Sequence, residues 1–115
     1  MEINNNKTMN QIKQEFSLLF PNLKLEFYNS KHDKKKGSPI KDRIKDNLHL
    51  GSVRKSKNEG IFMITPKMKV SSLEQSFETY YGIHIQVYRR SGKQWLQTIE
   101  TDDWSLALQN NEGDT

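Results

Sequence analysis

The fold is decided largely by one stretch of sequence, residues 70–88, which read VSSLEQSFETYYGIHIQVY. Intervals of three, four, three and one residues place its apolar side chains on one stripe of a helix. These side chains are Val70, Leu73, Phe77, Tyr80 and Tyr81. Gly82 ends the predicted helix, because glycine readily takes the left-handed conformation of a helix terminus. Apolar and polar residues then alternate from 83 to 88, which predicts a strand with one buried face.

The same pattern occurs earlier in the chain, where its first apolar residue, Met9, lies 61 positions before Val70. The earlier stripe consists of Met9, Ile12, Phe16, Leu19 and Phe20. Pro21 stops this helix, and residues 23–28 then alternate as residues 83–88 do, with an offset of 60. The repeat rests on pattern more than on identity. The identical positions are Gln14/Gln75, Phe16/Phe77 and Tyr28/Tyr88.

The later copy contains two further predicted strands. The apolar run 61–65 is typical of a strand buried on both faces. A Ser-x-x-Glu capping box at 71–74 opens the helix that follows. Ser91-Gly92 predicts a tight hairpin turn, which joins the strand at 83–89 to a strand at about 94–99.

The predicted fold is a single α+β domain over residues 1–115, with repeated units at about 8–28 and 61–99. We expect a mixed sheet of about four strands, with the two repeated helices packed on one face. The strands at 61–65 and 83–89 would run parallel through a right-handed connection. Residues 1–3 leave room only for a leading strand that is short or missing.

The net charge of +4 is unevenly distributed. Residues 24–57 carry eleven basic and four acidic side chains, a net charge of +7, whereas residues 100–115 carry five acidic side chains and no basic one. We interpret residues 29–59 as a basic loop with a short helix at 39–50, and residues 109–115 as a flexible acidic tail. The basic segment is either a solvated loop or a polyanion-binding surface. The polyanion-binding candidates are Lys34, Lys35, Lys36, Arg54 and Lys55.

Patterns for catalysis and metal binding are missing from the sequence. The chain has no cysteine, which excludes a disulfide scaffold and a thiolate metal site, and it has no Gly-x-Ser-x-Gly motif. Its histidines, His32, His49 and His84, form no ligand-spaced pair. We interpret Asp103 as the cap of a short helix and not as a catalytic acid. With no membrane-length apolar run and no signal-peptide pattern, we expect a cytoplasmic, non-enzymatic protein without a metal, a cofactor or a membrane partner.

Residues 68–110 resemble a group of small, uncharacterised bacterial proteins of Bacteroides type. The recurring pattern of that group is Val-x-x-Leu-x-x-x-Phe-x-x-x-(Phe/Tyr)-Gly-(Ile/Leu)-x-(Ile/Val)-x-Val. It is matched here by Val70, Leu73, Phe77, Tyr81, Gly82, Ile83, Ile85 and Val87. Residues 8–28 match only weakly, because Pro21-Asn22 stands where the pattern has glycine. The resemblance implies the helix–strand repeat and brings with it no reaction, cofactor or ligand.

The candidate interaction site lies on the outer face of the predicted sheet. If the helices cover the face that carries Leu25 and Ile85, the other face presents aromatic and charged side chains. The candidate residues are Tyr28, Tyr88, Arg89, Arg90, Lys93 and Trp95. Our leading hypothesis is a small module that binds a protein partner or itself, with the aromatics as anchors and the arginines as a charged rim. The alternative is single-stranded nucleic-acid binding by the basic segment 31–57 and the sheet aromatics, because bases stack on aromatic rings and phosphates pair with cations.

Overall fold

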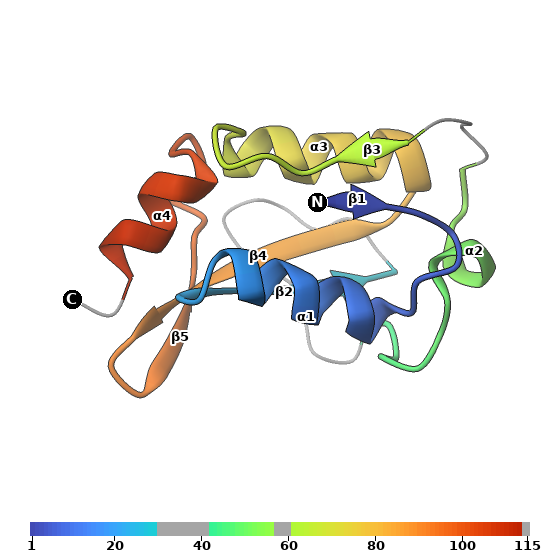
Figure 1. Cartoon of the computed structure of the whole chain (residues 1–115), viewed down its shortest axis with the longest axis horizontal. Coiled ribbons are helices and arrows are strands. Elements are labelled where there is room, and N and C mark those ends of the chain that lie inside the picture. The colour runs from blue at the N-terminus through green and yellow to red at the C-terminus, as the bar shows by residue number, and fades with distance from the viewer. Residues whose placement is uncertain (30–41, 57–60, 114–115) are drawn as a thin grey trace.

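A computed structural model of the chain describes residues 1–29, 42–56 and 61–113, which form four helices and five strands (Figure 1). The helices are α1 (Met9–Leu19), α2 (Leu50–Val53), α3 (Val70–Tyr81) and α4 (Leu106–Glu112). The strands are β1 (Glu2–Ile3), β2 (Leu23–Tyr28), β3 (Phe62–Met63), β4 (His84–Ser91) and β5 (Gln94–Gln97). The described strands pair as two antiparallel sheets, β1–β3 and β2–β4–β5. The predicted α+β class is therefore confirmed, but the expectation of a mixed sheet is wrong.

The pairing of β3 accounts for this difference. Phe62 and Met63 pair antiparallel with β1, which is the short leading strand, and not parallel with β4. The apolar run 61–65 is also not buried on both faces. Phe62 and Ile64 are buried, while Ile61 and Met63 between them are exposed. This alternation is that of a strand with one solvent face, so β3 covers the core and does not enter the larger sheet.

The two long helices begin in different ways. Thr8 caps α1 with a capping box, because its side chain accepts from the Gln11 backbone N–H and the Gln11 side chain accepts from the Thr8 N–H. In α3 the N-cap is Lys69, which makes no side-chain cap, and Ser71 already lies inside the helix. The expected capping box at 71–74 is therefore wrong. Backbone carbonyls of a distant segment, residues 102–104, accept from the first N–H groups of α3 instead.

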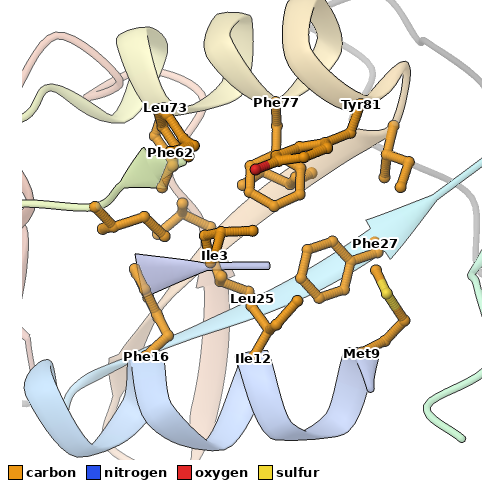
Figure 2. Packing of buried hydrophobic residues seen from close by; sticks show 14 of the residues in the cluster. Ile3, Met9, Ile12, Phe16, Leu25, Phe27, Phe62, Leu73, Phe77 and Tyr81 are labelled. Carbon is orange, nitrogen blue, oxygen red and sulfur yellow. The ribbon is translucent and has the colours of Figure 1, made fainter. Parts of the chain in front are cut away.

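Both helices pack on one face of the larger sheet, with β1 between them (Figure 2). The rings of Phe27 on β2 and Phe77 on α3 lie 5.6 Å apart, and Phe62 on β3 meets Phe77 edge-on at 6.0 Å. Ile3 lies between the two helices at the centre of the core. The predicted stripes are buried apart from their margins, where Leu19 and Tyr80 are exposed. One hydrophobic core thus receives side chains from both halves of the chain.

Two polar segments differ from their predictions. In the described part of 39–50, the backbone of residues 42–44 pairs with the outer edge of β2, with Ile44 N–H donating to Phe27 O at 2.7 Å, and the helix is only α2. Near the C-terminus, Ser105 caps α4 and Asp103 does not. Gln109, expected in a flexible tail, is completely buried in α4. Each segment is held by hydrogen bonds to residues far away in the chain, as between Ile44 and Phe27 and between Asn22 and Asn110. Local sequence patterns do not reveal such contacts.

Candidate interaction surface

The register of the larger sheet determines which side chains share its outer face. Glu26 lies opposite Gln86, Lys24 opposite Tyr88, and Tyr28 opposite His84. Directly opposed residues in an antiparallel pair point to the same side. Along the other edge of β4, where it pairs with β5, Arg90 lies opposite Trp95 on this same face of the sheet. We call this surface of β2, β4 and β5 the polar face.

The side chains at the centre of the polar face are buried, contrary to the expectation of an exposed aromatic surface. Tyr28 is completely buried, and its hydroxyl lies 2.7 Å from the Tyr88 hydroxyl. Glu26 and Gln86, beside these rings, are 6% and 3% exposed. Burial and the hydrogen bond to Tyr88 raise the pKa of the Tyr28 hydroxyl above its ordinary value. Tyr28 is therefore inaccessible to a partner on this face.

Residues 42–44 close this centre from the outer edge of β2. Arg43 pairs with Tyr28 as a β-bridge and hydrogen-bonds to its hydroxyl, while its Nε lies 3.6 Å from Glu26 Oε1. Lys13 reaches the same carboxylate from α1, with 2.7 Å between Nζ and Oε1. Burial lowers the pKa of Lys13, but its hydrogen bonds to Glu26 and Asp46 outweigh that effect and raise it. The buried charge of Glu26 is therefore compensated within the fold.

The hairpin end of the polar face remains accessible. The predicted hairpin is confirmed, although its two-residue turn is Gly92-Lys93 and not Ser91-Gly92, because Ser91 still pairs with Gln94. Figure 1 shows β5 extending away from α1 and α3. Lys24 Nζ lies 4.9 Å from the centre of the Trp95 ring and 5.4 Å from that of Tyr88. The Arg90 guanidinium lies 5.9 Å from the Trp95 ring, which is 37% exposed. We call Lys24, Tyr88, Arg90 and Trp95 the hairpin patch.

Cations held over aromatic rings are the main electrostatic feature of the hairpin patch. Burial, with the nearby charges of Arg43 and Lys13, lowers the pKa of Lys24 although Glu26 opposes the shift. The sequence prediction did not include Lys24 among the site residues. Its position opposite Tyr88 depends on the register between β2 and β4, which the sequence alone does not report.

The remaining predicted residues are divided between different places. Arg89 lies on the core side of β4, donates to Gln109 at 3.0 Å and contacts the Trp104 ring, so it holds α4 and is not part of the patch. Lys93 is exposed in the turn of the hairpin. Lys34, Lys35 and Lys36 lie outside the described residues.

The other two polyanion candidates make contacts within the fold. Arg54 donates to the Asn5 side chain at 2.8 Å and to the Tyr80 carbonyl at 2.9 Å, and it lies over the Tyr81 ring. Lys55 Nζ donates to the Asn29 carbonyl at 2.6 Å. Both side chains hold the segment before β3 against α3 and the end of β2. The described part of the basic segment therefore uses these cations for internal structure.

The two histidines among the described residues belong to different elements of the fold. His84 lies 3.2 Å from Glu78, and His49 is the N-cap of α2. In the described ranges, no cluster of three or more histidine or acidic side chains could hold a metal ion. None of the described helices is both long enough and apolar enough to span a bilayer. Comparisons of the chain with protein-family models, curated proteins and solved structures give no match.

Proposed function

We propose that this chain is a small, non-enzymatic interaction module that binds a protein through the hairpin patch. The observation that carries the proposal is Trp95, an exposed indole on a projecting hairpin that Lys24 and Arg90 both contact. Tryptophan and arginine are enriched among the residues that dominate binding energy at protein interfaces. Their mutual contacts also reduce the side-chain freedom that binding would otherwise remove.

The proposal includes the internal repeat, which the register of the larger sheet supports. Glu26 and Gln86 are 60 positions apart and lie directly opposite each other. Lys24 lies opposite Tyr88, and their counterparts 60 positions away are His84 and Tyr28. These two counterparts also lie opposite each other. This relation is that of a local two-fold axis through the Glu26–Gln86 pair. The two halves would then associate like the subunits of a dimer.

The starts of the helices support the same repeat. The N-terminus of α1 exchanges backbone hydrogen bonds with that of α2, as α3 does with α4. The paired bonds are Met9 N–H to Leu48 O with Val70 N–H to Trp104 O, and Leu50 N–H to Lys7 O with Leu106 N–H to Met68 O. The residues at the start of α1 and those at the start of α3 are 61 positions apart (9 to 70, 7 to 68). The residues at the start of α2 and those at the start of α4 are 56 positions apart (48 to 104, 50 to 106). The proposed unit therefore also contains α2 or α4.

Nucleic-acid binding receives less support from the same geometry. Stacking of a base requires an accessible ring face, but Tyr28 is buried, and Lys24 and Arg90 already lie over Trp95. Arg54 and Lys55 are engaged inside the fold. A protein partner needs no free ring face and can contact the exposed part of Trp95 and the charges around it.

Photo-crosslinking in the native cells tests the proposal. A benzophenone amino acid replaces Lys93 in the turn, and a control probe replaces Leu18, which is 81% exposed on α1. We expect a discrete adduct, identified by mass spectrometry, from position 93 and not from position 18. The adduct should disappear when Tyr88→Ala and Trp95→Ala are added, with the circular dichroism spectrum retained.

The following outcomes would overturn the proposal. One is an equal yield from both probe positions, and another is an adduct at position 93 that survives the double substitution in a folded chain. A third is an adduct with RNA or DNA in place of protein, which would favour the nucleic-acid hypothesis. In that case binding should also weaken steeply with salt, because counterions are released from the phosphates.

A further inference from the structure

Strand β5 forms an edge of the larger sheet. Among the described residues it pairs with β4 on one side and with no strand on the other. Its sequence, Gln94-Trp95-Leu96-Gln97, carries no charge, and all four residues are exposed. Natural proteins commonly protect such edges with lysine, proline or a bulge, because unpaired backbone groups accept another strand. Within β5 the chain has none of these protections.

The hydrogen-bond pattern shows which backbone groups of β5 point outward. Arg90 N–H donates to the Asn22 carbonyl, toward β2, so Arg90 and the opposing Trp95 form a non-hydrogen-bonded pair. Thr98 N–H donates to Val87 O, which fixes the same alternation further along the strand. The N–H and C=O groups of Trp95 and Gln97 therefore point away from β4, while those of Leu96 point toward it.

We propose that a second copy of this chain pairs antiparallel with the outer edge of β5. This inference goes beyond the proposed function, because it concerns the backbone edge of β5 and names a partner for it. With Leu96 on a two-fold axis, Trp95 of each copy lies opposite Gln97 of the other, and all outward backbone groups of the two strands are paired. Leu96, which is 41% exposed, then meets Leu96 of the second copy at the closest approach of the two strands.

The symmetry of the contact favours a second copy over an unrelated strand. The chain already joins its own halves in this way, because β2 pairs with β4 antiparallel about the Glu26–Gln86 pair. An uncharged strand also meets its own copy without like-charge repulsion. Four residues bury less surface than the roughly 1,200 Å² of stable complexes, so the dimer is weak and depends on concentration.

A single proline substitution tests the proposed hydrogen bonds at the outer edge of β5. Gln97→Pro removes an outward N–H and leaves the bonds between β4 and β5 intact, whereas the control Gln97→Ser loses the same side chain and keeps the N–H. Sedimentation velocity between about 10 μM and 1 mM covers the affinities of weak contacts. We expect the wild type and Gln97→Ser to rise from the 13.5 kDa monomer toward twice that mass, and Gln97→Pro to remain monomeric.

A cysteine variant provides a second test that does not depend on proline. The chain contains no cysteine, so Leu96→Cys introduces a single thiol. At a non-hydrogen-bonded antiparallel pair the Cα atoms are about 4.5 Å apart, which a disulfide can span. We expect rapid disulfide-linked dimer under mild oxidation, and little from the control Leu18→Cys, although Leu18 is the more exposed residue.

The results separate this inference from the proposed function. The inference is overturned if the wild type remains monomeric at all concentrations, if folded Gln97→Pro dimerises normally, or if the two cysteine variants cross-link equally. If the wild type is monomeric while the probe at position 93 captures a different identified protein, the proposed function stands alone. If the dimer survives Tyr88→Ala with Trp95→Ala, the edge pairing stands and the hairpin patch is not its binding surface.

Discussion

Removing the hydroxyl of Tyr28 or Tyr88 tests whether this hydrogen-bonded pair on the polar face contributes to stability. The Tyr28 and Tyr88 hydroxyls lie 2.7 Å apart in a hydrogen bond that either of them can donate, and Arg43, which can only donate, also hydrogen-bonds to the Tyr28 oxygen. Tyr88→Phe therefore removes from the fully buried Tyr28 hydroxyl the hydrogen-bond partner that is able to accept a proton. A buried unsatisfied hydroxyl costs about 1–3 kcal/mol, so we expect the free energy of unfolding to fall by about 1–2 kcal/mol.

The reverse substitution should cost less. Tyr28→Phe leaves the Tyr88 hydroxyl, which is only partly buried and has Gln97 Nε2 at 3.5 Å and solvent nearby. We expect a loss of about 0.5–1 kcal/mol, and a double variant little worse than Tyr88→Phe alone. The interaction energy between the two sites should then equal the Tyr28→Phe loss, about 0.5–1 kcal/mol. Urea unfolding followed by circular dichroism measures the stability of the wild type, both single variants and the double variant.

Two outcomes would refute this reasoning. If the two single substitutions cost the same and their effects add, the hydroxyls do not depend on each other, and the polar face is open to water. If Tyr88→Phe is neutral, Tyr28 must be solvated in the wild type. An unchanged dependence on urea concentration across the variants serves as the control that the unfolding reaction itself is the same.

Two further predictions concern glycine and pH. Gly82 and Gly92 both have positive φ, 67° and 59°, so alanine costs each about 1 kcal/mol of strain. Gly82→Ala should lower the melting temperature further, because its Cβ would lie 2.9 Å from Lys55 Cβ whereas Gly92 is open. Burial raises the pKa of Tyr28, so the folded chain holds that proton more tightly. The stability that this shift contributes should be fully present below about pH 10, the ordinary tyrosine pKa, and should be lost as the pH rises further. Above about pH 10 the urea midpoint should therefore fall less steeply with pH for Tyr28→Phe than for the wild type, and an equal fall would contradict this.

The helices and strands follow from periodicities that the sequence carries locally. The stripe from Val70 to Tyr81 matches α3 residue for residue, and the positive φ of Gly82 ends that helix as predicted. The alternation in 23–28 appears as β2, and the predicted hairpin joins β4 to β5, with its turn one residue later than expected, at Gly92-Lys93. Such elements are predictable because neighbouring residues determine them.

The candidate site was predictable only in part. The sequence identified Tyr88, Arg90 and Trp95 of the hairpin patch, but it included Tyr28, which is buried, and Arg89, which points to the core side. It left the fourth member, Lys24, out of the candidate residues, because the rings that Lys24 contacts, Tyr88 and Trp95, lie more than sixty positions away. Alternation along one strand shows which residues share a face, but not what else covers that face.

The amino-acid sequence by itself determined the amphipathic helices, the strands and the tight turn, because each depends on spacings of a few residues. Only the tertiary structure decided that β1 and not β4 pairs with β3, that distant carbonyls replace a side-chain cap at α3, and that Arg43 closes the polar face. These contacts join segments far apart in the chain. Every residue except proline carries the same backbone donor and acceptor, so their partners depend on which segments the shared core brings together.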